Sequence, residues 1–128
     1  MTLPVNARIQ AAQSFVRTVR SAREFLLQQD IHSTDERYAA LLAQLAEARQ
    51  LLRWNPAAGR PARFLGAQSA QGQIQAQRAQ ALAEAQGLPQ LRELIVKPHV
   101  LLYAHGSDRV LLLALRHERQ LEFQLPPG

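Results

Sequence analysis

The chain contains no cysteine, so no disulfide holds its fold and no thiol takes part in its chemistry. This absence fits a reducing environment, and we expect a cytoplasmic protein. Four histidines are present, but none of them pair at the helical spacing of zinc ligands. We therefore predict no metal site, and no motif for a cofactor is found either. No apolar run is long enough for a signal peptide or a bilayer span, so we expect no membrane association.

Lysine is almost absent, because Lys97 is the only lysine among the fifteen basic residues and all the others are arginine. Mutational bias in a GC-rich genome explains such an excess. The alternative explanation is selection for the planar guanidinium group, which suits phosphates and carboxylates. We favour the first explanation for the whole chain and the second for the arginines near its C-terminus. The net charge of +5 favours acidic partners, either nucleic acid or an acidic protein.

The length of 128 residues predicts a single domain, residues 1–128, with one modest core. Its first part, residues 6–54, has the apolar periodicity of a helical hairpin. One helix is predicted over residues 6–29 with Asn6 as its cap, and another from residue 33 or 34 to residue 53. The apolar stripe of the second helix consists of Leu41, Leu45, Ala48 and Leu52. The sole tryptophan, Trp54, is expected to anchor this helix in the core, or else to be exposed for a partner.

The middle of the chain has weaker signals. Residues 56–61 predict a turn, and residues 62–65 a short first strand. Residues 66–88 are dominated by alanine and glutamine, and we interpret them as an insertion. Between residues 70 and 86 the composition favours a helix, but only two residues there are large and apolar. We therefore expect this helix to be loosely held or only partly ordered.

Residues 91–125 change to the pattern of a β-meander. Strands are predicted over residues 91–96, 100–105, 110–115 and 121–125. Pro98 marks the first turn and residues 106–108 form a hairpin loop. The third strand is apolar throughout, which is typical of a central strand, whereas the fourth alternates like an edge strand. The predicted fold is α+β, with the helical hairpin packed on a small twisted antiparallel sheet and a helical insertion around residues 70–86.

A basic cluster, Arg116-His117-Glu118-Arg119, follows the third strand. We predict that Arg116, His117 and Arg119 bind the target, although a solvated strand end explains them equally well. Arg60 and Arg63 follow the turn and are further candidates for the same surface, although a simple surface role explains them better. Arg92 is another candidate, with local pairing to Glu93 and Asp108 as the alternative. His99 and His105 are interpreted as structural, and Tyr103 as a core residue with a hydrogen-bonded hydroxyl.

Three local sequences, in this order, resemble the RelE/ParE superfamily of bacterial toxins. Residues 56–61 look like the Pro-x-x-Gly-Arg turn that follows the second helix of the family. Leu91-Arg92-Glu93-Leu94 and then Val100-Leu101-Leu102-Tyr103 look like its Leu-Arg strand and its tyrosine-containing strand. Residues 109–117 look like its last long strand, which often ends in a histidine with an arginine close behind. The resemblance covers most of the chain except residues 66–88.

The resemblance implies the toxin of a type II toxin–antitoxin system, of the plasmid-stabilisation type, which arrests growth until a cognate antitoxin neutralises it. RelE-like members cut messenger RNA on the ribosome, and ParE-like members inhibit DNA gyrase. RNA cleavage requires a base, an acid and cationic stabilisation of the phosphate. This chain has Leu91, Glu93 and Val100 at or near three basic positions of RelE-like enzymes, and Phe123 where their C-terminal tyrosine would be.

We therefore prefer the ParE-like interpretation, in which the protein binds gyrase and is not an enzyme. The alternative is a ribosome-dependent endoribonuclease with His117 as a candidate acid or base. A third possibility is a non-toxic nucleic-acid-binding or regulatory module. For the antitoxin we expect an apolar groove between the helices and the sheet, which a disordered tail occupies as it folds.

Overall fold

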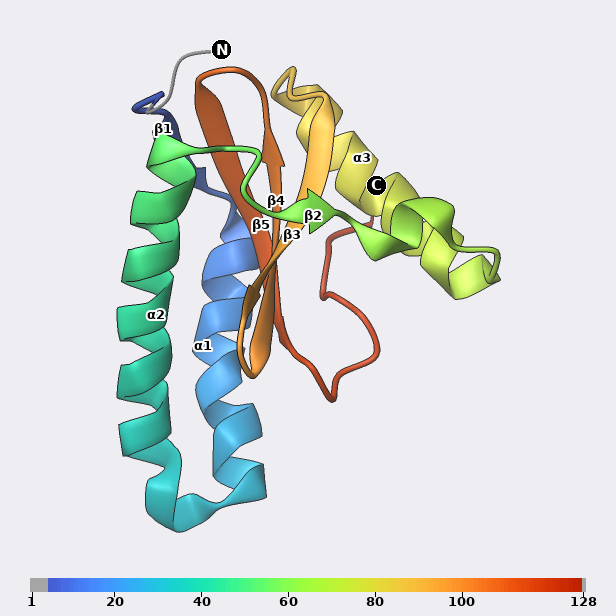
Figure 1. Cartoon of the computed structure of the whole chain (residues 1–128). Helices are drawn as coiled ribbons and strands as arrows, with labels where there is room; N and C mark the ends of the chain where they lie inside the picture. Colours follow the sequence, from blue (N-terminus) through green and yellow to red (C-terminus); the bar gives the residue numbers. More distant parts are fainter. Residues whose placement is uncertain (1–4, 128) are drawn as a thin grey trace.

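The computed structural model describes residues 5–127, and its sheet lies between helices on both faces (Figure 1). Helices α1 and α2 form an N-terminal hairpin against one face, and α3 covers the other, so the predicted α+β class and hairpin are confirmed. The elements are β1 (Arg8–Ala11), α1 (Gln13–Gln29), α2 (Thr34–Trp54), β2 (Arg60–Pro61), α3 (Ala70–Ala85), β3 (Gln90–Val96), β4 (His99–His105) and β5 (Arg109–His117). Short 3-10 turns at Ile31–Ser33 and Arg63–Gly66 precede α2 and α3.

The strand order of the sheet is β1-β5-β4-β3-β2, with the predicted meander of β3, β4 and β5 at its centre. β4 pairs antiparallel with both of its neighbours. β1 runs parallel to β5, with Ile9 opposite Val110. The sheet is therefore mixed, and not wholly antiparallel as the sequence predicted.

The predicted helix over residues 6–29 is wrong at its start, because residues 8–11 form β1. Asn6 has a φ of 58°, a left-handed conformation that interrupts a helix, so this residue caps none. The Arg8 N–H donates to the carbonyl of Asp108 over 2.9 Å, and the Ala12 N–H donates to that of Leu112 over 2.9 Å. Residues 8–11 form a strand despite their helical periodicity, because β5 is buried and its edge would otherwise keep unpaired backbone groups.

α1 covers the edge of β5 beyond the end of β1, through two buried hydroxyl side chains. Ser14 Oγ donates to the Leu113 carbonyl over 2.5 Å, and Thr18 Oγ1 accepts from the Leu115 N–H over 2.9 Å. Leu113 is the extra residue of a β-bulge, because the register between β4 and β5 shifts there. The two hydroxyls thus satisfy backbone groups of β5 that have no strand partner.

α2 agrees with the sequence in its bounds and in its buried stripe, which consists of Leu41, Leu45, Ala48 and Leu52. Asp35 and Glu36 occupy its first turn, where negative charge suits the helix dipole. Trp54, at the end of α2, is 53% exposed. The expectation that it anchors the helix in the core is therefore wrong, and the alternative of an exposed tryptophan holds.

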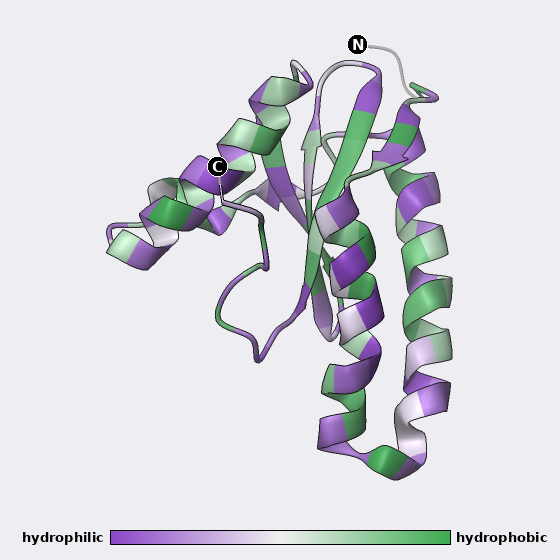
Figure 2. Ribbon diagram, turned by 180° about the vertical axis from the view of Figure 1, so that it is seen from behind, coloured by the Kyte–Doolittle hydropathy of each residue, from purple (hydrophilic) through white to green (hydrophobic). Residues whose placement is uncertain are grey.

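The predicted helix in the alanine- and glutamine-rich segment exists as α3, but it is not loosely held. Ala79 and Ala83 are buried against the sheet in one cluster with Leu88, Leu91 and Leu102. Figure 2 shows strongly hydrophobic stretches in the strands beside an α3 that alternates between hydrophilic and weakly hydrophobic residues. The buried residues of this helix are both alanines. Small side chains let the helix approach the sheet closely, so a thin apolar face is enough.

Two predicted strands are wrong. Residues 121–125 form no strand and cross the α3 side of the sheet, where Phe123 and Leu125 are buried. The β1 strand already occupies the edge of β5 on which they could have paired. Residues 62–65 belong largely to the 3-10 turn, because β2 is limited to Arg60–Pro61.

Tyr103 holds the turn at residues 56–61 against the sheet. Its position in the core and its hydrogen-bonded hydroxyl confirm the prediction for this residue. The hydroxyl donates to the Pro56 carbonyl over 2.7 Å and accepts from the Gly59 N–H over 2.9 Å. A Cβ on residue 59 would lie 2.5 Å from the carbonyl oxygen of Glu93. Only glycine therefore lets this turn approach β3 and bring Arg60 beside Glu93.

We expect Tyr103→Phe to lower the free energy of unfolding by about 1–3 kcal/mol, because it leaves the Pro56 carbonyl and the Gly59 N–H without their partner. Denaturant titration measures the loss. Tyr38→Phe is the matched control, since the Tyr38 hydroxyl has no hydrogen bond within residues 5–127. Equal losses for the two variants would contradict the role given to Tyr103.

Candidate target-binding site

Three arginines from separate elements gather around one buried carboxylate, and we call Arg60, Arg63 and Arg116 the arginine cluster. The carboxylate is that of Glu93 on β3, which is 2% exposed. It accepts a hydrogen bond from Arg60 Nε over 3.3 Å and another from the Arg63 N–H over 3.2 Å. Arg116 on β5 lies on the same face of the sheet as Glu93, two strands away from it. Arg116 is opposite Val100 of β4, and Val100 is opposite Ile95, which lies two residues beyond Glu93 on β3.

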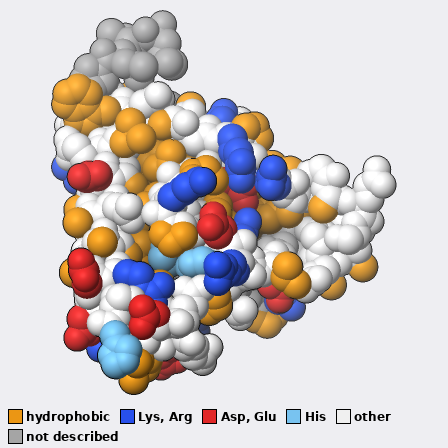
Figure 3. Space-filling view, turned by 60° about the horizontal axis from the view of Figure 1, so that its bottom comes forward, with side chains coloured by type: hydrophobic (Ala, Val, Ile, Leu, Met, Phe, Trp, Pro, Cys, Tyr) orange, Lys and Arg blue, Asp and Glu red, His pale blue; other side chains and the backbone are white. Residues whose placement is uncertain are grey.

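Arg116 is held in place by contacts with the C-terminal segment. Its Nη1 donates to the Gln120 carbonyl over 2.9 Å, and its guanidinium carbon stands 5.1 Å from the centroid of the Phe123 ring. Burial lowers the pKa of Arg116 from its ordinary value; the charge of Glu93 opposes this shift, and those of Arg60 and Arg63 add to it. The Arg116 guanidinium therefore lies within the electrostatic influence of Glu93, Arg60 and Arg63. Figure 3 shows Lys and Arg side chains next to Asp and Glu side chains on the face that it draws.

Arg92 lies on the opposite face of the sheet from the arginine cluster, because it pairs with Tyr103 beneath the helical hairpin. Its Nε donates to Nε2 of His105 over 3.0 Å, and its Nη1 donates to the Gly59 carbonyl over 2.9 Å. The Nδ1 of His105 lies 2.8 Å from the Gly106 carbonyl, so the neutral ring donates there and accepts from Arg92. Burial lowers the pKa of His105, which favours this neutral form.

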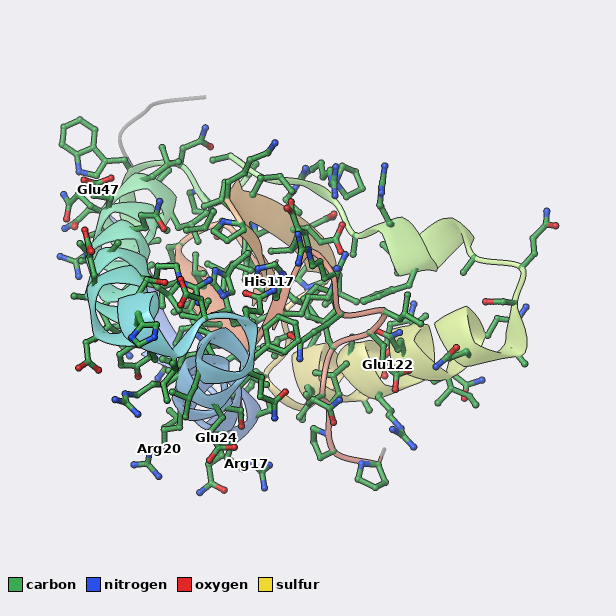
Figure 4. All side chains as sticks on the ribbon, turned by 90° about the horizontal axis from the view of Figure 1, so that it is seen from below. Arg17, Arg20, Glu24, Glu47, His117 and Glu122 are labelled. Atoms are coloured by element: carbon green, nitrogen blue, oxygen red, sulfur yellow. The ribbon has the colours of Figure 1, made fainter. Side chains whose placement is uncertain are left out.

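His117 also faces the hairpin, away from the arginine cluster. Its ring is buried, with its centroid 4.9 Å from that of Phe25 and 5.2 Å from that of His99. Its Nδ1 accepts from the Arg119 N–H over 3.1 Å. Burial lowers the pKa of His117, and the charges of Arg119 and Arg37 add to this shift while Glu118 opposes it. Figure 4 labels His117 in the interior of the view and the exposed Arg17 and Arg20 at its periphery.

The four-residue basic cluster of the sequence is thus divided between two faces. Arg116 points to the α3 side, His117 points to the hairpin side, and Arg119 is exposed in the turn after β5. Arg119 lines an open groove with Arg37 and Glu118 near the tip of the hairpin. Of the predicted site residues, the structure brings together Arg60 and Arg116, and places Arg92, His117 and Arg119 elsewhere.

His99 is more unusual than its interpretation as a structural histidine suggested. It is 3% exposed, and neither ring nitrogen has a hydrogen-bond partner within the described residues. Together with His117 it lines a small cavity of about 20 Å³ beneath α1. Burial lowers the pKa of His99 to about 4, and the nearby His117 adds to the shift. The pair is therefore neutral at physiological pH.

A model of the family described as the ParE toxin of type II toxin–antitoxin systems matches residues 9–122. This chain belongs to the ParE toxin family. No curated protein matches it. The match extends from β1 into the C-terminal segment, and so it spans the elements that carry the arginine cluster.

The sequence analysis of this ParE-family toxin missed the central role of the Glu93 carboxylate in the site. Glu93 was considered only as a departure from the RelE-like pattern and as a local ion-pair partner of Arg92, whereas Arg63 was considered with Arg60 for the same surface. The position of Glu93 in the alternating pattern of the strand, between Leu91 and Ile95, could have indicated its role. A carboxylate at such an inward position is nearly always paired with a positive charge. Within residues 5–127, no helix is long and apolar enough to span a membrane, and no three acidic or histidine side chains could together hold a metal ion.

We expect the stability of this ParE-family toxin to fall as the pH is lowered from about 6.5 to about 4, partly because of His99. The pKa of His99 is lower in the folded chain than its ordinary 6.5, so the unfolded chain takes up a proton first. The stabilisation is therefore present above pH 6.5 and is lost toward pH 4, by at most about 3 kcal/mol.

Denaturant titrations at several pH values measure this dependence. His99→Leu should flatten the decline, whereas His32→Leu, at an exposed position, should leave it unchanged. A decline of the same steepness in the His99 variant would refute the assignment.

We expect Glu93→Gln to destabilise the fold by about 1–3 kcal/mol, because it leaves the arginine cluster without its buried counter-charge. Glu24→Gln, at an exposed position of α1, is the control and should change stability little. Thermal unfolding of both variants makes the comparison. If Glu93→Gln proved neutral, the cluster would not need its carboxylate.

Proposed function

We propose that this ParE-family toxin arrests growth by binding and inhibiting DNA gyrase in the cytoplasm, and that a cognate antitoxin neutralises it. Family membership supports the toxin role. The observation that favours binding over catalysis is the separation of the arginine cluster from the histidines. Arg60, Arg63 and Arg116 lie on the α3 side, whereas the rings of His99 and His117 are buried on the hairpin side.

Ribonuclease chemistry would need an acid and a base close to the cationic groups. The carboxylate within the arginine cluster, that of Glu93, is buried and already accepts two hydrogen bonds. Phe123, at the expected position of the RelE-like tyrosine, lies buried under Arg116 and has no hydroxyl to offer. The RelE-like alternative, with His117 as acid or base, has less support from this arrangement.

Within this proposal, Arg60 and Arg116 contact the target, and Arg63 joins them. Arg119 lies in the turn after β5, near the tip of the hairpin, and is a separate, more peripheral candidate. Arg92 and His117 were also predicted to bind the target. Both are held by internal hydrogen bonds, so we propose that they support the site from within the fold.

For the antitoxin, we propose the open groove between α2 and β3, which has a volume of about 420 Å³. Its position between the helices and the sheet is the one expected from the sequence. Leu51 and Ile95 line it and remain exposed, so they offer apolar contacts to a tail that folds on binding. Co-purification with the product of an adjacent small gene tests the pairing, and Leu51→Glu should weaken it.

Purified toxin should block supercoiling of relaxed plasmid by gyrase. Arg116→Gln should raise the half-inhibitory concentration about tenfold or more, because the variant removes one guanidinium from the contact surface. Arg17→Gln on the outer side of α1 is the matched control and should act like the wild type. Induced expression in cells should stop growth, and the antitoxin should restore it.

Other outcomes would redirect the assignment. Growth arrest with normal supercoiling and with messenger RNA cut on ribosomes, abolished by His117→Ala, would establish the endoribonuclease instead. Absence of any growth arrest would favour the non-toxic nucleic-acid-binding or regulatory module. In either case gyrase inhibition would be rejected.

A further inference from the structure

The arginine cluster carries more positive charge than the fold needs. Within the described residues, only the Arg60 guanidinium forms an ion pair with Glu93, because Arg63 bonds this carboxylate through its backbone N–H and Arg116 donates to carbonyls of the C-terminal segment. The Arg63 guanidinium itself has no hydrogen-bond partner within residues 5–127, and its side chain is exposed. Guanidinium donors left free in this way suit a planar anion, which they can bind in a bidentate manner.

Exposed aliphatic side chains flank the cluster. Leu65 lies two residues after Arg63 in the same 3-10 turn and is 44% exposed. Leu121 is 92% exposed and comes directly after Gln120, whose carbonyl accepts from Arg116. Exposed aliphatic residues next to several arginines are typical of protein interfaces, where apolar contacts exclude water from a central charged contact.

A nucleic acid fits this surface less well. Single strands are bound through aromatic side chains on which bases stack, but Phe64 and Phe123, the aromatic residues beside the cluster, are both buried. Contacts with duplex phosphates use polar and positively charged surfaces, and the aliphatic flank would gain nothing there. The aliphatic flank therefore favours a protein as the source of the anion.

We propose that the arginine cluster binds a carboxylate side chain of the target protein, and that Leu65 and Leu121 contact apolar residues of the target on either side of it. The identity of the partner, DNA gyrase, rests on the proposed function above. The segment of the target that is recognised should therefore carry an acidic residue between apolar residues. The arrangement also assigns a role in recognition to Arg63, Leu65 and Leu121, beyond that of Arg60 and Arg116.

The test measures the affinity of the purified full-length toxin for purified gyrase by biolayer interferometry, and for a linear DNA duplex in parallel. Arg63→Gln and Leu121→Ser should each weaken gyrase binding about tenfold or more, and neither should alter duplex binding more than about twofold. Arg17→Gln and Ile31→Ser are matched controls, because Arg17 is exposed on α1 and Ile31 is 66% exposed at the hairpin tip. Both controls should bind like the wild type.

Neither test variant removes a hydrogen bond of the described fold, so their melting temperatures should equal that of the wild type. Unchanged gyrase affinity in both variants would overturn the inference. Weakened duplex binding with unchanged gyrase binding would overturn it too, in favour of a phosphate site.

Failure of the proposed function gives a different result. If the wild-type toxin binds no gyrase but still arrests growth, gyrase is not the target. The inference then survives only if Arg63→Gln and Leu121→Ser abolish the arrest while Arg17→Gln and Ile31→Ser retain it. Arrest by all four variants would exclude the surface for any target.

Discussion

The outer edge of β5 is the constraint on which the rest of this structure depends. β5 is buried on both faces, so every backbone group along it needs a partner inside the protein. β4 satisfies one edge. The other edge is satisfied first by β1 and then by the hydroxyls of Ser14 and Thr18, which belong to α1. The strand therefore determines where the N-terminal segment pairs and where α1 lies, and α2 packs beside α1 over the same face of the sheet.

Burial of both faces also explains how the candidate site is assembled. Side chains alternate along β5, so Arg116 faces the α3 side and His117 faces the hairpin. On the α3 side, the turn at Gly59 and the 3-10 turn bring Arg60 and Arg63 against Glu93, and the C-terminal segment positions Arg116 through Phe123. On the hairpin side, the histidines and Arg92 are enclosed by helices and bonded to neighbouring groups. The charged residues therefore divide into an accessible set and an internal set.

Features governed by local periodicity could be predicted from the sequence. The stripe of α2, the three strands of the meander, α3 and the hydrogen-bonded Tyr103 all follow from residue spacing and propensity. The errors arose where partners distant in sequence compete. Residues 8–11 have helical spacing, yet pairing with β5 makes them a strand. Residues 121–125 alternate like a strand, yet β1 already pairs with the edge of β5, and the same alternation buries Phe123 and Leu125 instead.

By itself the sequence determined the α+β class, the helical hairpin, the meander and the family to which the chain belongs. These depend on patterns within single segments and on the order of those segments along the chain. The tertiary structure alone decided which basic residues meet. Arg116 and His117 are neighbours in the chain but lie on opposite faces, whereas Arg60 and Arg116 are far apart in sequence and share one face. The physical reason is that the face of a strand residue depends on pairing register and on β-bulges, which are set by contacts between distant segments.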